Sequence, residues 1–255
     1  MCSSDLEVVK VIYLLRLPEN NFREKTWLYA GTSVYLELRM LKLINMREKV
    51  SSADNQQGSR QNFVKNLSDP SETTRRAPLF KAYLLGALHD GTFSSNKRFR
   101  ISQAGTDWLK FLQKLFKYLD YNSWIYKEGK YRRVYVLETL ADFLDFNFNP
   151  LRLRSDEEKI GYIRGFFDAE GGIPKNKEAR FYIQLVQNDR EKLVKIKKLL
   201  NDLRIKTGKI HNPSRSVDPD YWRMYVLAKS QQSFLKKIGT WHPRKIKTLR
   251  QRMMI

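Results

Sequence analysis

The sequence has little of what secreted and membrane proteins need. Its 255 residues include one cysteine, Cys2, which excludes an internal disulfide and favours a reducing compartment. No uninterrupted apolar run reaches the ~18 residues of a membrane span, and no signal peptide is evident. We therefore expect an intracellular protein without a membrane partner, in the cytoplasm or nucleoid, or in an organelle matrix if the gene is organellar.

Acidic residues are also scarce relative to basic ones. The chain has 27 Asp and Glu against 48 Lys and Arg, which gives a formal charge of +21. Residues 151–255 alone carry +14 of this charge. Such an excess favours a polyanion as partner and makes its binding sensitive to salt. Charge alone does not separate a DNA-binding protein from a generic basic RNA-binding protein.

Two short stretches repeat one pattern within this basic chain. Residues 83–91 read YLLGALHDG and residues 163–171 read IRGFFDAEG, each an apolar helical run with a glycine that ends in an acid and a second glycine. Glycine lets two such helices approach closely. An acid at a helix C-terminus faces the negative end of the macrodipole, and two adjacent acids raise each other's pKa. A bound divalent cation would offset both of these unfavourable electrostatic effects, so Asp90 and Glu170 are predicted to bind a metal.

The similarity continues beyond the two motifs, as a true internal repeat requires. The strings Arg133–Leu137 and Arg223–Leu227 are nearly identical, and short helices are expected to follow them at Phe143-Leu144 and Phe234-Leu235. One further strand is expected at Ile205–Ile210. Each half is therefore predicted to be helix–strand–strand–helix–strand–strand–helix, with antiparallel sheets of the α+β class.

These motifs resemble the signature helix of the LAGLIDADG homing endonucleases, in the form with both copies on one chain. The second copy is the closer match and has, in the family's positions, Gly165, Asp168, Glu170 and Gly171. In the first copy, Gly86 lies four residues before the acid instead of five, which we interpret as a helix that ends in a different turn. The resemblance implies two pseudo-symmetric αββαββα repeats that form a saddle of antiparallel sheets on paired motif helices.

The resemblance also implies the domain organisation. Residues 79–154 would form the first LAGLIDADG repeat and residues 155–255 the second. Residues 1–78 share nothing with the family, and the polar composition of residues 51–77 predicts a disordered linker. This N-terminal extension is either disordered protein, which would add DNA contacts if it is genuine, or group I intron sequence read through in frame.

The activity implied by the resemblance is site-specific cleavage of double-stranded DNA with a long target site, by a monomer that promotes intron or intein mobility. Asp90 and Glu170 would be catalytic and would hold Mg²⁺, with Mn²⁺ as a substitute. The polar and basic residues that the family places around such a pair are, by matching strings, Gln103, Gln187, Arg154 and Lys247. His89 is interpreted as a local substitution, because the second repeat has no histidine there.

Recognition of a duplex requires long polar side chains two residues apart on the outward face of a strand. The residues expected to contact DNA in the first half are Arg98, Arg100, Ser102, Arg133 and Tyr135. Those expected in the second half are Arg180, Tyr182, Gln184, Arg223 and Tyr225.

Two alternatives to the nuclease stay open. An RNA maturase that assists splicing of its host group I intron would bind intron RNA, and such proteins can retain both acids. A splicing assay separates this function from DNA cleavage. A non-cleaving DNA-binding relative of the same fold is the other alternative; loss of one acid would indicate it, and both acids are present.

Overall fold

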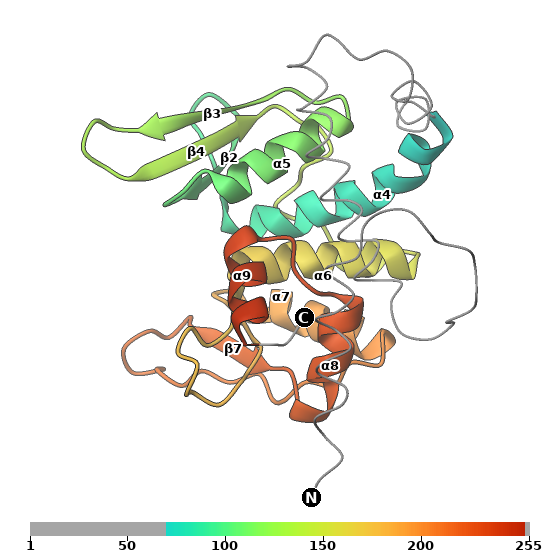
Figure 1. Ribbon diagram of the computed structural model, residues 1–255, viewed down its shortest axis with the longest axis vertical. Coiled ribbons are helices and arrows are strands. Elements are labelled where there is room, and N and C mark those ends of the chain that lie inside the picture. Colours follow the sequence, from blue (N-terminus) through green and yellow to red (C-terminus); the bar gives the residue numbers. More distant parts are fainter. Residues whose placement is uncertain (1–69, 253–255) are drawn as a thin grey trace, which may run out of the picture. The chain divides into compact units, whose positions relative to one another are not determined.

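The structure is a computed structural model, and it describes residues 70–252 (Figure 1). All described residues belong to one compact unit. Most of the expected N-terminal extension therefore lies outside the described residues; its last part, residues 70–78, is helical. Within residues 70–252, none of the helices is both long and apolar enough to cross a membrane.

The first half carries a four-stranded antiparallel sheet with strand order β1-β2-β4-β3. Its elements are α4 (Pro70–Ala87), the 3₁₀ turn η1 (Leu88–Asp90), β1 (Gly91–Phe93), β2 (Phe99–Gln103), α5 (Asp107–Tyr118), β3 (Ser123–Glu128), β4 (Val134–Thr139) and the 3₁₀ turn η2 (Pro150–Arg152). Ile101 pairs with Leu137, and both are buried in the core with the apolar residues of α5. One face of this sheet is thus covered by α5.

The second half carries a three-stranded antiparallel sheet with strand order β5-β6-β7. Its elements are α6 (Asp156–Glu170), β5 (Gly171–Gly172), β6 (Gln184–Gln187), α7 (Arg190–Asp202), β7 (Trp222–Tyr225), α8 (Ala228–Lys237) and α9 (Pro243–Gln251). Leu185 pairs with Met224, and both are buried in the core with the apolar residues of α7. Antiparallel sheets with one helix-covered face confirm the predicted α+β class.

Two expected elements differ from the prediction. The strand expected at Ile205–Ile210 is reduced to isolated pairings of Thr207 with Val226 and of His211 with Arg223. The short helix expected at Phe143-Leu144 is absent from the described first half, whereas α8 forms its counterpart in the second. The first-half segment makes a local turn instead, in which the Asp145 side chain accepts from the main-chain nitrogen of Asn147 at 2.8 Å. Such side-chain bonds compete with a helix.

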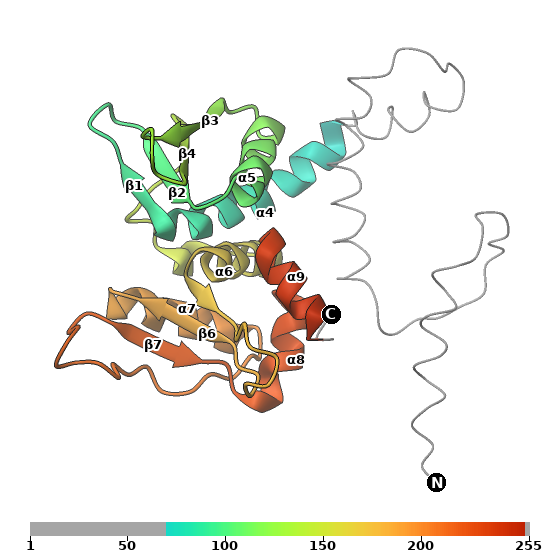
Figure 2. The same cartoon turned by 60° about the vertical axis from the view of Figure 1, so that its left-hand side comes forward.

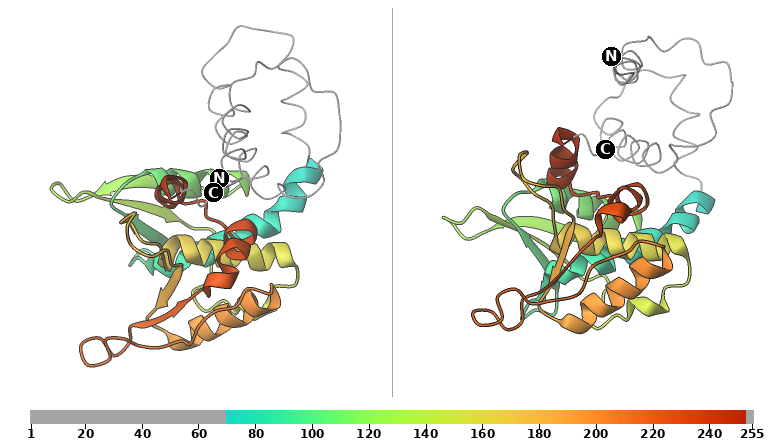
Figure 3. Two further views of the ribbon diagram at one scale, coloured as in Figure 1. Left: turned by 60° about the horizontal axis from the view of Figure 1, so that its bottom comes forward. Right: turned by 90° about the horizontal axis from the view of Figure 1, so that it is seen from below.

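The two motif helices, α4 and α6, lie side by side between the two sheets (Figures 2 and 3). A Cβ atom on Gly86 would collide with main-chain atoms of Tyr162 and Phe166, and one on Gly165 with those of Tyr83 and Ala87. Only glycine permits this approach. These two sets of contacts interchange when residue numbers are shifted by 79, so the halves are related as a pseudo-symmetric pair.

Candidate active site

Each candidate acid lies where a motif helix meets the strand that follows it. Glu170 ends α6 and Asp90 ends η1, and a glycine begins the next strand in both cases. A 3₁₀ turn rises about 2.0 Å per residue, against about 1.5 Å in an α-helix. The first motif therefore reaches its strand in fewer residues, which accounts for the shorter spacing after Gly86. The interpretation that the first helix ends in a different turn is confirmed.

The two acids are partly buried and interact electrostatically. Burial raises the pKa of Asp90 to about 6, although the hydrogen bond from Gln103 and the charge of Lys245 act in the opposite direction. Burial also raises the pKa of Glu170 to about 7, with the negative charge of Asp90 as the second cause. Like charges have this effect at short range. The charge of Asp90 therefore acts on Glu170 across the contact between the halves.

The two predicted glutamines occupy the same register in their sheets. In each half, the glycine after the acid pairs with the residue two positions before the glutamine: Gly91 with Ile101, and Gly171 with Leu185. Gln103 Nε2 donates to Asp90 Oδ2 at 2.5 Å and so orients that carboxylate. Gln187 Nε2 lies 3.3 Å from His89 Nδ1 instead. Only the first glutamine is bonded to an acid.

The basic side chain that acts on both acids is Lys245 in α9, which the matching strings did not single out. Its Nζ donates to the main-chain oxygen of Asp168 at 2.9 Å and also to that of Phe167. Burial lowers the pKa of Lys245 to about 8, against the charges of Asp168 and of both acids. The predicted Lys247 is exposed. It lies two helical positions further on, and residues two apart do not share a helix face.

The predicted Arg154 lies at the opposite end of α6 from Glu170. Arg154 is exposed and directly precedes Ser155, the N-cap residue of this 15-residue helix. At about 1.5 Å per residue, the helix separates the two positions by about 22 Å. The expectation that Arg154 lies near the acids is therefore corrected. Its string leads into α6, whereas the matching string of the second half forms α9.

Asp168 joins the two halves inside the core. The hydroxyl of Tyr83, on α4, donates to its Oδ2 at 2.6 Å, and the main-chain nitrogen of Trp241 donates to the same oxygen at 2.9 Å. Thr240 donates to its other oxygen. Burial raises the pKa of Asp168, and these donors oppose the shift. The network fixes the segment that leads into α9 and thereby holds Lys245 beside the acids.

A cavity of about 420 Å³ opens beside Glu170, so this acid is not sealed beneath side chains. Its polar lining includes His89, Gln187, Asn188 and Lys192. Burial lowers the pKa of His89 to about 3, and the positive charge of Lys192 lowers it further. The imidazole is therefore neutral at physiological pH.

The predicted DNA contacts of the first half divide between the two faces of its sheet. By the alternation of side chains along the strand, Arg98, Arg100 and Ser102 lie on the face of the sheet that points away from α5. Arg100 is ion-paired there with Glu128 at 2.6 Å and with Glu138 at 3.2 Å. Tyr135 pairs with Gln103 and packs against the core, so its expected outward position is corrected by the alternation of the strand. Arg133 is exposed, immediately before β4.

In the second half, the predicted contacts on the strands share one face. Gln184 pairs with Tyr225, and Arg223 pairs with Val186, while the intervening Leu185 and Met224 are buried. Tyr182 and Arg180 lie in an irregular segment before β6, where a strand was expected. The ring of Tyr182 packs edge-on against that of Tyr225, with 5.8 Å between centroids. Gln184, Arg223, Tyr225 and Tyr182 therefore group on the side of the sheet away from α7, and Arg180 is exposed ahead of them.

The donor set suits a hard divalent cation whose coordination is completed by oxygens of the substrate. Asp90 and Glu170 supply carboxylate oxygens, which Mg²⁺ prefers. Residues 70–252 hold no group of three or more His, Cys, Asp or Glu side chains placed for a metal. A protein shell of two carboxylates leaves most of the coordination to water and phosphate oxygens, as is common for Mg²⁺.

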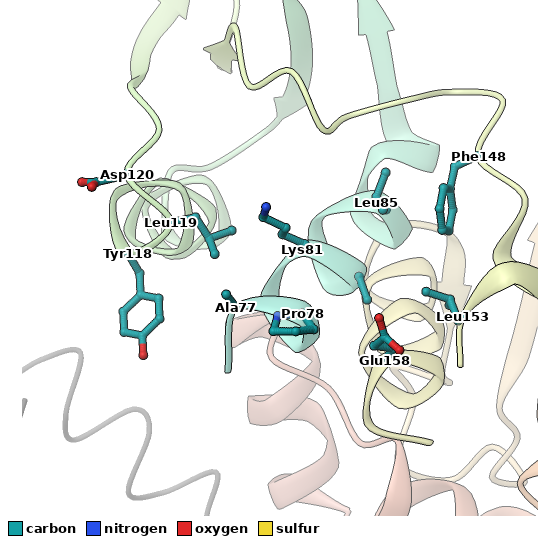
Figure 4. A pocket seen from close by; sticks show the side chains of 11 residues that line it. Ala77, Pro78, Lys81, Leu85, Tyr118, Leu119, Asp120, Phe148, Leu153 and Glu158 are labelled. Carbon is teal, nitrogen blue, oxygen red and sulfur yellow. The ribbon is translucent and has the colours of Figure 1, made fainter. Parts of the chain in front are cut away.

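A second hollow, of about 560 Å³, lies against the other part of α4 (Figure 4). Its lining includes Pro78 and Lys81 of α4, Leu119 after α5, and Leu153 and Glu158 near the start of α6. Neither candidate acid lines it. Phe148, which also lines it, belongs to the segment that follows β4 without forming a helix.

Residues 157–239 match the family model described as the LAGLIDADG-like domain. No curated protein matches the chain. Among solved structures, I-DmoI in complex with DNA and Ca is similar at 19% identity and a TM-score of 0.52, over 69% of this chain and 99% of that one. Full-length DUF199/WhiA from Thermatoga maritima is similar at 20% identity and a TM-score of 0.51, over 69% of this chain and 61% of that one.

These likenesses establish the fold. The fold is shared both by I-DmoI and by DUF199/WhiA. A shared fold does not determine function. Function has to be argued from the acids, the lysine and the sheet faces of this chain.

Proposed function

We propose that this protein is a divalent-metal-dependent endonuclease that cuts both strands of duplex DNA at a long target site. The observation that carries the proposal is the pair of coupled acids at the ends of two packed helices, beside an open cavity. A purely structural role gives no reason to keep two mutually repelling carboxylates there. Because one chain supplies both acids, we propose that it acts as a monomer, inside the cell, and that cleavage promotes intron or intein mobility.

In this proposal each side chain has a defined task. Asp90 and Glu170 would hold Mg²⁺ or Mn²⁺, and the bound ion would activate water and stabilise the leaving oxygen. Gln103 orients the carboxylate of Asp90. Lys245 offsets the negative charge that gathers at the phosphate. Water would attack phosphorus, the bond to the leaving sugar oxygen would break, that oxygen would take up a proton, and the proton lost from water would pass to solvent.

DNA recognition would come from the outward sheet faces. Gln184, Arg223 and Tyr225 share such a face in the second half, where the excess of basic residues is also greatest. Arginine and glutamine are suited to guanine and adenine edges in the major groove. In the first half the guanidinium of Arg100 is ion-paired with Glu128 and Glu138, and that of Arg98 is ion-paired with Glu138 at 3.2 Å, so we expect Ser102 to be the freest of the three to contact DNA.

Metal dependence has support from the geometry and from a relative of the same fold. I-DmoI has been solved with DNA and Ca, and an I-DmoI variant with its target DNA in the presence of Mn. Both acids must be ionised to hold a cation. Because their pKa values are raised to about 6 and about 7, cleavage should increase as the pH rises through this range.

The test begins with selection of bound duplexes from a random DNA pool in the absence of divalent metal. The selected duplex is then incubated with Mg²⁺, and the ends of the products are mapped. Double-strand cleavage that EDTA abolishes is the expected result. Asp90→Asn and Glu170→Gln should each abolish it while binding stays measurable, because each removes a charged ligand without changing shape. Wild-type rates in either variant would contradict the assignment.

The two alternatives are outcomes of the same experiment. Tight binding of the selected duplex without any cleavage, with either Mg²⁺ or Mn²⁺, would indicate a non-cleaving DNA-binding protein. Splicing of a host intron RNA only in the presence of the protein would indicate a maturase. Either result, if no cleavage is seen, would contradict the proposed nuclease function.

A further inference from the structure

His89 is held inside the protein by two hydrogen bonds on opposite sides of its ring. Its Nε2 lies 2.7 Å from the Tyr162 hydroxyl, and its Nδ1 lies 3.3 Å from Gln187 Nε2. The Gln187 Oε1 accepts from the main-chain nitrogen of Asn188 at 2.8 Å, which fixes the orientation of the amide. Because the amide nitrogen can only donate, Nδ1 accepts, and the proton of the neutral ring lies on Nε2.

The pseudo-symmetry shows what His89 replaces. The shift of 79 positions that relates the motif helices relates Tyr83 to Tyr162 and His89 to Asp168. Tyr83 bonds Asp168 at 2.6 Å, and Tyr162 bonds His89 at 2.7 Å. The same tyrosine contact is therefore made twice, once to a carboxylate and once to an imidazole. The carboxylate only accepts, whereas the imidazole, while donating to Tyr162, also offers an acceptor to Gln187.

Because of this substitution, the two glutamines have different hydrogen-bond partners. Gln103 and Gln187 have the same register relative to the glycine after each acid, so Gln187 is placed to serve Glu170 as Gln103 serves Asp90. Gln187 and Glu170 also line the same cavity. Yet Gln187 bonds His89, and no hydrogen bond joins Glu170 to another side chain of residues 70–252. One acid is oriented by an amide and the other is not.

We propose that His89 makes the two strands unequal substrates. His89 holds Gln187 away from Glu170. The carboxylate of Asp90 is therefore oriented in advance by Gln103, whereas the carboxylate of Glu170 is not oriented by an amide. The strand served by Asp90 is then cut first, and a duplex nicked in that strand is an intermediate. His89 and Gln103 are positioning residues, since they act through the acids. The inference rests on the proposed nuclease function and concerns the order of its two cuts.

The test measures the cleavage rate of each strand separately, with the selected duplex labelled on one strand at a time. The ratio of the two rates is insensitive to the fraction of folded protein, because both cuts are made by the same molecules. We expect a ratio between about 10 and 100, the range that a misplaced group costs. Gln103→Met should slow the faster strand selectively, which identifies that strand as the one served by Asp90.

His89→Phe is the decisive variant. It retains the ring that packs edge-on against Phe166, at 4.8 Å between centroids, but removes the acceptor that holds Gln187. Gln187 is then free to reach Glu170, so the slower strand should accelerate and the ratio should fall towards one. Adding Gln187→Met to this variant should restore the ratio. Phe148→Leu, in the wall of the same cavity, is the matched control and should leave the ratio unchanged.

The outcomes separate the two proposals. No cleavage of either strand, with Mg²⁺ or Mn²⁺, refutes the nuclease itself. Cleavage of both strands at equal rates in the wild type refutes only the inference about His89, as does an unchanged ratio in folded His89→Phe. If His89→Phe does not fold, the ratio in the wild type and its response to Gln103→Met still decide the matter.

Discussion

After β4, the chain of the first half turns back through η2 into α6, whereas after β7 the chain of the second half forms two helices, α8 and α9. The second closure covers Arg164, whose guanidinium stacks on Trp241 at 4.4 Å. Leu85, 79 positions earlier, lines both the hollow of Figure 4 and the cavity beside Glu170. The halves thus share a framework of helix, glycine and sheet, but only one of them is closed by helices.

The duplicated site has parts that match between the halves and parts that have diverged. Both halves have an acid where the motif helix meets its strand, a glycine at the helix contact and a glutamine in the same register. The basic side chain and the partner of the motif tyrosine are not the same in both halves. The first set is constrained by the close approach of two backbones, whereas the basic side chain belongs to α9, which lies outside that contact.

Matched substitutions in the two halves should differ most at Lys245, the lysine found in one half only. Lys245→Met should reduce the rate of cleavage by between about 100- and 1000-fold, the cost of removing one preorganised group that stabilises charge. Its first-half counterpart by string, Arg152, is exposed, and Arg152→Met should change the rate by less than about threefold. Single-turnover rates at saturating Mg²⁺ measure both. Equal losses in the two variants would contradict the placement of Lys245 at the site.

A smaller effect is expected where the two motif tyrosines differ in partner. The Tyr83 hydroxyl donates to the buried carboxylate of Asp168 and accepts from Trp108 Nε1 at 3.0 Å. Tyr83→Phe should therefore lower the free energy of unfolding by about 1.5–3 kcal/mol, as for hydrogen bonds to charged groups. Tyr162→Phe removes a bond to a neutral ring and should cost about 0.5–1.5 kcal/mol. Urea unfolding followed by circular dichroism measures both. A larger loss in Tyr162→Phe would contradict the assigned partners.

The fold and the acid pair were predictable because their signals are local and repeated. The motifs place an apolar run, a glycine and an acid at fixed spacing, and the second occurrence confirms the first. Strand faces follow from alternation, which correctly groups Gln184, Arg223 and Tyr225. The same rule applied from the wrong starting residue misplaced Tyr135, because a strand boundary shifts every face by one position.

The basic residue and the histidine were not predictable by string matching. Matching Arg154 to Lys247 ignored that one string leads into α6 while the other becomes α9, so equal spacing along the chain did not mean equal placement. His89 was interpreted as a local substitution, but its role depends on Tyr162 and Gln187, which lie 73 and 98 positions away. Such contacts become visible only once the two halves are packed.

Asp90 and Glu170 are proposed to share one site, and the pKa of Glu170 is the quantity that depends most closely on this. Titration of Glu170 by NMR, in protein freed of metal with EDTA, should give a pKa of about 7. Asp90→Asn should lower it, because removal of a nearby negative charge makes the ionised form easier to reach. Glu158→Gln, at the far end of α6, should leave it unchanged. A Glu170 pKa that does not fall in Asp90→Asn would show that the two acids do not share a site and would contradict the proposed nuclease function.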